Sequence, residues 1–358
     1  ASKTHSLGWV AEAAVDKARE QAAKLIHATP HEIIFTSGAT EGINLAIKGV
    51  WEMNSNPGAV DSERSVKNHI ITVVTEHKAV LDTCKYLEAK GARVTYLPVN
   101  REGLIDLQEL ANAITPSTIL VCVMHANNET GVVQPINAMS KIVHENNCLL
   151  MSDATQAAGK INVDVEADRI DLLCLSAHKF YGPKGIGALY VRRKDPRVNV
   201  SPLIHGGGHE RGLRSGTLNV PAIVGFGKAC EIAGKEMWED AERISKFRTM
   251  LEQGLQKPEN VFINGSVKNR LSNTTNLSFQ GLKAAELIVK LPDLAMATGS
   301  ACTSAVAEPS HVLRAMGMSD EMAYSSIRFS LGKFTTKEET EYAIEKVTQK
   351  VLELRNSK

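Results

Sequence analysis

Over the first two-thirds of the chain, short apolar runs alternate with longer stretches in which apolar residues recur every third or fourth position. The short runs predict buried strands, and the longer stretches predict amphipathic helices. Helices are expected over residues 9–26, 43–50, 79–89, 107–113 and 138–145, and strands over residues 33–35, 69–74, 92–97, 118–124, 149–152, 172–176 and 187–191. Such alternation is typical of an α/β fold built around a largely parallel sheet.

A long charged helix, predicted over residues 222–256, interrupts this alternation. Separated strands follow at residues 276–279 and 326–331, with helices between and after them, which is typical of a smaller α+β domain. At 358 residues the chain exceeds the size at which one hydrophobic core usually stops growing. We therefore expect a large domain over residues 1–232 and a small C-terminal domain over residues 233–358.

Composition excludes several function classes without selecting one. The formal net charge of +1 provides no basic surface for nucleic acid or an anionic membrane, and no apolar run is long enough to span a bilayer. The first residues lack the apolar segment of a signal peptide. The six cysteines show neither a CxxC motif nor metal-ligand spacing, so we expect no metal site and a reducing, cytoplasmic compartment.

A lysine and an aspartate follow two of the predicted strands. Lys179 comes after the apolar run at residues 172–176, and Asp153 directly follows the run at residues 149–152. Either residue alone is more often a solvated strand terminus. Together they are what pyridoxal phosphate (PLP) needs, because the lysine forms a Schiff base with the aldehyde and the aspartate keeps the pyridine nitrogen protonated.

A turn of small polar residues, 36–41, lies between a predicted strand and a predicted helix. Backbone N–H groups and hydroxyls at the positive end of a helix suit a phosphate, and Thr40 belongs to this turn. Ser176 and His178, beside the lysine, can supply further donors. Taken alone the signal is weak, since such turns are also common as helix caps.

Four further polar residues are candidates for cofactor or substrate contacts. His77 can stack on a planar cofactor and exchange protons, or can simply begin a helix. Asn128 follows a strand and can bind the ring hydroxyl or a substrate carboxylate. Gln156, expected at the start of a helix, can hydrogen-bond the ring oxygen. Arg328, in the middle of a predicted strand, is either a bidentate carboxylate clamp or an exposed strand arginine.

Seven short motifs in this order closely resemble NifS/IscS-type cysteine desulfurases: SGATE (37–41), TEH (75–77), NNETG (127–131), DATQ (153–156), SAHK (176–179), GGGHERGLRSGT (206–217) and GSACTS (299–304). These enzymes belong to the class-V aminotransferase family of fold-type I PLP enzymes. Each motif is unspecific by itself, but their conjunction is specific and covers nearly the whole chain. The segment SACTSAVAEPS (300–310) is similar to the group with an extended catalytic loop.

The resemblance implies an α/β fold, with a mainly parallel seven-stranded sheet in the large domain, and a PLP site. Lys179 would hold the cofactor covalently and Asp153 would pair with its pyridine nitrogen. His77 would stack on the ring and act as acid and base, while Gln156 would contact the ring oxygen. The phosphate would be bound by Ala39, Thr40, Ser176 and His178.

The resemblance also implies a second group of roles. Thr217 would reach the phosphate of the neighbouring subunit's cofactor, so a homodimer is expected. Asn128 and Arg328 would bind the substrate carboxylate. Cys302 would be the nucleophile that accepts sulfur.

The implied activity converts L-cysteine to L-alanine and leaves the sulfur on an enzyme cysteine as a persulfide. The sulfur would go to an iron–sulfur scaffold or another acceptor protein, for cluster assembly and related thiolation pathways. A selenocysteine lyase, an aminotransferase of the same family and a non-catalytic binding protein are the alternatives. The family's N-terminal strand is absent from this chain, and its C-terminal tail is shorter than in the housekeeping members, which leaves scaffold docking open.

Overall fold

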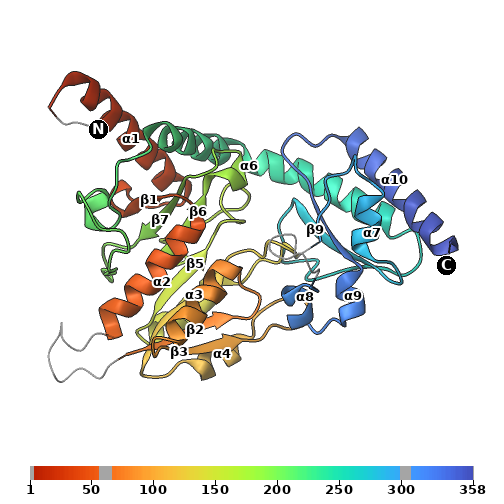
Figure 1. Ribbon diagram of the computed structural model, residues 1–358, viewed down its shortest axis with the longest axis horizontal. Coiled ribbons are helices and arrows are strands. Elements are labelled where there is room, and N and C mark those ends of the chain that lie inside the picture. The colour runs from red at the N-terminus through yellow and green to blue at the C-terminus, as the bar shows by residue number, and fades with distance from the viewer. Residues whose placement is uncertain (1–3, 56–66, 299–307, 358) are drawn as a thin grey trace. The chain divides into compact units, whose positions relative to one another are not determined.

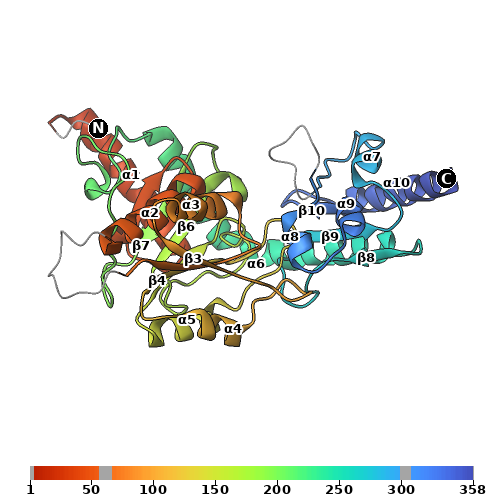
Figure 2. The ribbon, with the colours of Figure 1, turned by 60° about the horizontal axis from the view of Figure 1, so that its bottom comes forward.

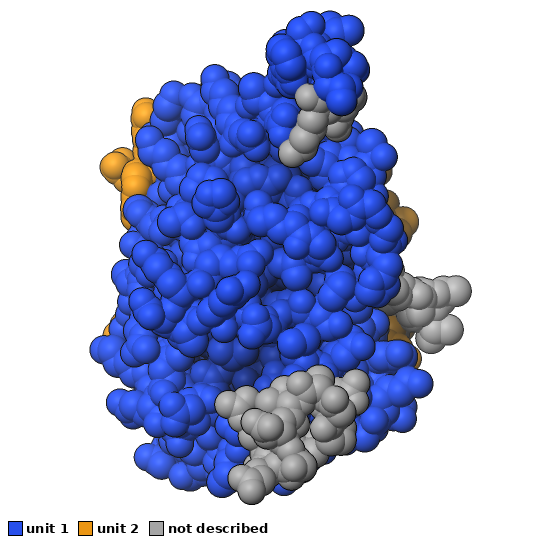
Figure 3. Space-filling model, turned by 90° about the vertical axis from the view of Figure 1, so that its left-hand side faces the viewer, with its two compact units in different colours: residues 1–97, 106–125, 134–237 blue, residues 98–105, 126–133, 238–358 orange. Residues whose placement is uncertain are grey.

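The computed structural model describes residues 4–55, 67–298 and 308–357. The chain forms two compact units, which Figure 3 distinguishes by colour. Unit 1 comprises residues 1–97, 106–125 and 134–237, and unit 2 comprises residues 98–105, 126–133 and 238–358. Two short segments from the first half of the chain therefore belong to unit 2. The division into domains at residues 232 and 233 stays a prediction, and it falls within the long helix α6, Val220–Leu255.

Unit 1 is built on a seven-stranded sheet with the order β1-β7-β6-β5-β4-β2-β3. Strands β2 to β6 run parallel to one another, and β7 is antiparallel to both β6 and β1. This arrangement confirms the predicted mainly parallel sheet. The strands are β1 Ile33–Thr36, β2 His69–Val73, β3 Arg93–Leu97, β4 Thr118–Met124, β5 Leu149–Asp153, β6 Leu172–Ser176 and β7 Gly187–Val191.

Helices cover both faces of this sheet. In Figure 2, α2 and α3 lie on one face and α4 and α5 on the other. The central strands read as continuous apolar runs because both faces are buried; every residue of β4 is buried, for example. The helices of unit 1, besides the first part of α6, are α1 Ser6–Leu25, α2 Ala39–Ser55, α3 Lys78–Glu88, α4 Leu107–Ala113 and α5 Ile136–Glu145. Short 3-10 helices occupy Pro30–Glu32, Ala177–Phe180 and Glu210–Gly212.

Unit 2 contains a three-stranded antiparallel sheet in the order β10-β9-β8. Its core joins the second part of α6 to these strands and to α7 and α10. Strand β8, Val261–Ile263, was not predicted, because it has three residues and only one of them is buried. The other elements are β9 Thr274–Phe279, β10 Ser326–Ser330, α7 Ala284–Val289, α8 His311–Ala315, α9 Asp320–Tyr324 and α10 Lys337–Asn356, drawn in blue shades in Figure 1.

The polypeptide offers no membrane-spanning helix in its described parts, since none is both long and apolar enough to cross a bilayer. Similarly, within residues 4–55, 67–298 and 308–357, no three His, Cys, Asp or Glu side chains gather in an arrangement that could hold a metal ion.

Candidate functional site

The predicted cofactor residues of unit 1 meet at one edge of its sheet. Asp153 is the last residue of β5, Ser176 is the last residue of β6, and these two strands are parallel neighbours. Gly187 of β7 pairs with both Ser176 and Thr36, so the end of β1 lies in the same row. Ligands in open α/β sheets bind at this carboxyl edge, which makes it the candidate site.

Lys179 lies in the 3-10 helix that directly follows β6, not on the strand itself. The preceding apolar strand is buried throughout, whereas the lysine side chain is exposed and forms no hydrogen bond or ion pair with any described residue. Its neighbour Phe180 is buried and packs on Phe226 of α6, with ring centroids 5.8 Å apart. The turn is therefore anchored by an aromatic contact while the amine stays accessible.

Asp153 is only 8% exposed at the end of β5. One carboxylate oxygen, Oδ1, accepts a hydrogen bond from the Thr155 amide at 2.9 Å, and the backbone oxygen accepts one from the His125 amide at 2.9 Å. The prediction that Gln156 begins a helix is wrong: residues 155–160 form turns, in which Gly159 has a left-handed φ of 72°. The Gln156 carbonyl oxygen accepts from Lys160, and its amide nitrogen donates to no described residue.

The small-residue turn brings a helix N-terminus close to Ser176. Helix α2 begins at Ala39, directly after Gly38, and Thr40 lies exposed in its first turn. Gly38 has a φ of 156°, and a Cβ placed on it would lie 3.9 Å from the Ser176 hydroxyl oxygen. These groups form a set of hydrogen-bond donors that fits a phosphate. They are the backbone of the glycine-containing turn, the positive end of the 17-residue helix α2 and the nearby Ser176 hydroxyl.

His178 completes this donor set. Its Nδ1 lies 3.0 Å from the Ser176 hydroxyl oxygen. Burial, together with the charges of Lys179 and Lys184, lowers the pKa of His178 below its ordinary value. The imidazole is therefore mainly neutral at neutral pH and acts as a hydrogen-bonding group rather than as a cation.

The segment that carries Thr217 is tied to the same turn through an ion pair. Glu41 accepts hydrogen bonds from the Ser37 amide at 2.8 Å and from Arg214 Nε at 2.9 Å. Although burial raises the pKa of Glu41, the bonds from Arg214 and Ser37 outweigh it and lower that pKa overall. Thr217 itself is exposed.

His77 is the N-cap of α3, which agrees with the interpretation that this residue begins a helix. Its Nδ1 accepts a hydrogen bond from the Ala79 amide at 3.1 Å, while the side chain remains exposed. Because Nδ1 is an acceptor here, the proton of the neutral ring is on Nε2. The cap thus orients the ring and leaves Nε2 available for proton exchange.

Asn128 and Arg328 are brought together within unit 2. Arg328 lies at the centre of β10, opposite Asn276 of β9, and its Nη1 donates to the Asn128 backbone oxygen at 3.0 Å. The Arg328 Nε is buried and has no hydrogen-bond partner among the described residues. An unsatisfied guanidinium donor is costly unless an acceptor arrives, so this arginine suits a carboxylate ligand.

Comparison with known proteins agrees with this geometry. The family model described as "Aminotransferase class-V" matches residues 1–342. The chain belongs to the class-V aminotransferase family. It is 52% identical over 356 residues to a protein named "Cysteine desulfurase IscS" from Tolumonas auensis, an alignment that covers 99% of this chain and 86% of that protein.

Solved structures give the same relationship for this class-V aminotransferase. One is a "NIFS-LIKE PROTEIN" with a TM-score of 0.88 and 40% identity, covering 98% of this chain and 91% of that one. Another, "SspA in complex with cysteine", has a TM-score of 0.79 and 38% identity, covering 94% and 91%. The predicted family and fold are confirmed.

The predicted nucleophile, Cys302, lies outside the described residues. The other five cysteines of this class-V aminotransferase are free and buried. Burial raises the pKa of each of them; for Cys84, with added repulsion from Glu76 and Glu88, the pKa rises to about 12. Because the thiolate is the reactive form, none of these five suits nucleophilic attack.

Sequence reasoning missed the buried carboxyl group of Glu76 beside the candidate site. It is 1% exposed and lies between β2 and His77, where its side chain contacts the end of β4. The available signal was an acidic residue only three positions after the end of a buried apolar strand, where a carboxylate needs a specific partner.

Proposed function

We propose that this chain is a PLP-dependent cysteine desulfurase that converts L-cysteine to L-alanine and takes up the sulfur as a persulfide on Cys302. The names of the IscS relatives support the activity, and family membership supports PLP as the cofactor. The related SspA, solved with cysteine, supports the choice of substrate. The main structural support for the proposal is that Asp153, Ser176 and Lys179 lie at or just after the ends of two adjacent parallel strands.

The cofactor, when bound, supplies an aldehyde that condenses with an amino group and a ring that accepts electrons from the substrate's α-carbon. Lys179 would hold it through its accessible amine, and Asp153 would pair with the pyridine nitrogen. Gln156 would donate from its amide nitrogen to the ring oxygen. The phosphate would be held by Ala39, Thr40, Ser176 and His178.

Substrate binding and sulfur transfer depend on residues of unit 2. Arg328 would bind the carboxylate of L-cysteine through its unsatisfied Nε, supported by Asn128. The Cys302 thiolate attacks the substrate sulfur, so that an S–S bond forms as the C–S bond breaks. L-Cysteine and one enzyme thiol thereby become L-alanine and one enzyme persulfide, without any external oxidant or reductant.

His77 would move protons during this conversion. Because the Ala79 amide occupies its Nδ1, exchange would take place at Nε2. An imidazole can both accept and donate a proton near neutral pH.

Replacing Cys302 with alanine tests the activity directly. We expect Cys302→Ala to lose sulfur transfer from L-cysteine while the visible absorption of the bound cofactor persists. A matched control is Cys84→Ala, which removes a buried thiol with a raised pKa and should keep desulfuration. Retained desulfuration in Cys302→Ala would contradict the proposal. Amino-group transfer unaffected by the substitution would identify an aminotransferase instead.

We also propose a homodimer in which Thr217 completes the partner's phosphate site. The exposed apolar residues Leu7, Trp9 and Val10 near the start of α1, whose first turns project from unit 1 in Figure 1, favour burial against another copy. In the segment before Thr217, the non-glycine residues Glu210 and Arg211 have left-handed φ values of 49° and 58°, and strain of this kind concentrates at functional sites.

Subunit complementation tests this arrangement. Differently tagged Lys179→Ala and Thr217→Ala chains are co-expressed and the mixed dimer is purified. If Thr217 acts across the interface, one site of the mixed dimer is intact, so it should regain about half of the wild-type activity per dimer. Activity no higher than that of the Thr217→Ala homodimer would place the residue in its own subunit's site.

The sulfur acceptor and the compartment belong to the same proposal. We propose an iron–sulfur scaffold or another thiol-bearing acceptor protein as the recipient and the cytoplasm as the location. The five free cysteines among the described residues are consistent with a reducing compartment. Transfer of radiolabelled sulfur from the persulfide to purified candidate acceptors identifies the recipient.

A further inference from the structure

Glu76 is an almost completely buried carboxyl group beside the candidate site that has no role in the chemistry described above. It follows β2 in a tight turn, in which its amide donates to the Val73 oxygen at 3.2 Å, and it directly precedes His77. With 1% exposure, it must satisfy its polar atoms within the protein.

One carboxyl oxygen of Glu76 reaches across the sheet edge to the next strand. Its Oε1 accepts a hydrogen bond from the Met124 amide at 2.5 Å. Met124 is the last residue of β4 and is the register partner of Asp153 in β5. The next amide, that of His125, donates to the Asp153 oxygen at 2.9 Å. Hydrogen bonds to two consecutive amides, Met124 and His125, thus connect the Glu76 side chain with the backbone of Asp153.

We propose that Glu76 is a positioning residue for the cofactor site, which holds the ends of β2 and β4 together and thereby fixes both His77 and Asp153. Because Glu76 directly precedes His77, its position in the turn determines where the His77 N-cap and helix α3 begin. Through Met124 it sets the end of the strand against which Asp153 is aligned. This inference rests on the proposed function, because it assigns those two residues to a PLP site.

The charge state of Glu76 supports the assignment. Burial, and next the nearby negative charge of Asp153, raise the pKa of Glu76 well above its ordinary value, and the Met124 hydrogen bond offsets this only in part. The raised pKa favours the neutral carboxyl form of Glu76, which avoids a second negative charge beside Asp153.

Two substitutions separate the hydrogen bond from the charge. Glu76→Gln keeps an acceptor for the Met124 amide and stays neutral, so it should match wild type. Glu76→Leu keeps the volume and loses the acceptor. A matched control is Glu32→Leu, another glutamate with 1% exposure that accepts from a backbone amide, that of Arg193 at 3.0 Å. Glu32 precedes β1 and so lies at the opposite edge of the sheet.

Two readouts are measured on the full chain: the dissociation constant for PLP added to the apoprotein, and hydrogen exchange of the Met124 and His125 amides without PLP. We expect Glu76→Leu to weaken PLP binding about tenfold and to speed exchange at both amides, because a buried donor is left unsatisfied. Glu76→Gln should stay within about twofold of wild type. Glu32→Leu should lower stability without changing PLP affinity.

Wild-type PLP affinity and amide protection in folded Glu76→Leu would overturn the proposal. A PLP affinity that falls equally in Glu32→Leu would show a general stability effect and would also overturn it. If Glu76→Leu does not fold, the PLP affinity of Glu76→Gln tests the proposal. Loss of PLP affinity in Glu76→Gln would contradict a role for residue 76 as the hydrogen-bond acceptor of the Met124 amide. Failure of the wild-type chain to bind PLP refutes the proposed function itself, which distinguishes the two failures.

Discussion

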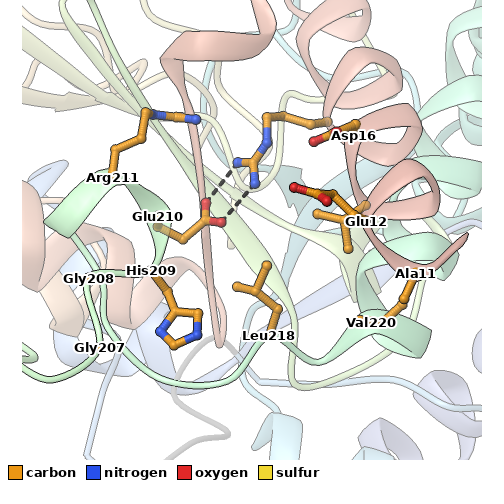
Figure 4. Close-up of a pocket in the computed structure, with 12 residues that line it drawn as sticks. Ala11, Glu12, Asp16, Gly207, Gly208, His209, Glu210, Arg211, Leu218 and Val220 are labelled. Carbon is orange, nitrogen blue, oxygen red and sulfur yellow. Dashed lines mark hydrogen bonds and ion pairs between the residues drawn. The ribbon is translucent and has the colours of Figure 1, made fainter. Parts of the chain in front are cut away.

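Replacing Glu210 with alanine is expected to destabilise unit 1 strongly. Both oxygens of this carboxylate accept hydrogen bonds from Arg19, each at 2.7 Å, and Oε2 also accepts from the Phe35 amide at 2.8 Å. The two side chains are 1% and 10% exposed. Arg19 and Glu210 both line a cavity of about 540 Å³, together with other residues of α1 and residues 207–211. Glu210 is labelled in the close-up of this cavity (Figure 4).

The magnitude follows from what the alanine variant leaves behind. Removing one partner of a buried ion pair costs about 3–5 kcal/mol, because an uncompensated charge stays buried. Arg19 would keep its bond to the Ile33 oxygen at 2.7 Å and its position 4.6 Å from the centre of the Phe35 ring. These remaining contacts place the expected loss near the lower limit, at about 3 kcal/mol.

A double-mutant cycle with urea unfolding, followed by circular dichroism, measures this value. Arg19→Ala, Glu210→Ala and the double variant should show a coupling energy of about 2 kcal/mol or more, since both partners act on each other. A loss below about 1 kcal/mol in Glu210→Ala, or a coupling energy near zero, would refute the reasoning because it is the behaviour of a solvent-exposed pair.

Three further predictions follow from the described residues. Gly187→Ala should weaken PLP binding and lower the midpoint of thermal unfolding, because its Cβ would lie 2.4 Å from the Leu175 oxygen; unchanged PLP titration and melting curves would contradict this. Burial lowers the pKa of His125 from 6.5 to about 4 in the folded protein. As the pH drops, the unfolded chain therefore binds a proton at this histidine at a higher pH than the folded chain does. The free energy of unfolding should fall between about pH 6.5 and about pH 4. Urea titrations at several pH values should show a smaller decrease in His125→Asn, and an equal decrease would be contrary to that expectation. Arg328→Lys should raise the KM for L-cysteine about tenfold or more and change kcat less, because a single ammonium cannot replace the guanidinium fork; an unchanged KM would argue against carboxylate binding.

Much of unit 1 could be predicted because local patterns determine it. The strands that carry Asp153 and Ser176 are apolar runs buried on both faces, so their ends, and the residues that follow, could be placed from the sequence alone. Strand β8 could not be found, since three residues with one buried position carry no periodic signal.

Other features of the site depend on contacts that no local pattern shows. Gln156 was expected at a helix start, but residues 155–160 form turns that include the left-handed Gly159. Arg19 and Glu210 are 191 positions apart in the sequence, and their pairing arises only when α1 packs beside residues 206–212. Glu76 similarly gains its partner, Met124, from the order of the strands rather than from its own neighbours in the chain.

The most direct test of the central claim is mass spectrometry of the peptide that contains Cys302, after incubation of the PLP-bound protein with L-cysteine and without added thiol. The proposed function predicts that this peptide gains one sulfur atom while an equal amount of L-alanine appears. An unmodified Cys302 accompanied by L-alanine, or sulfur bound to another cysteine in its place, would contradict the assignment.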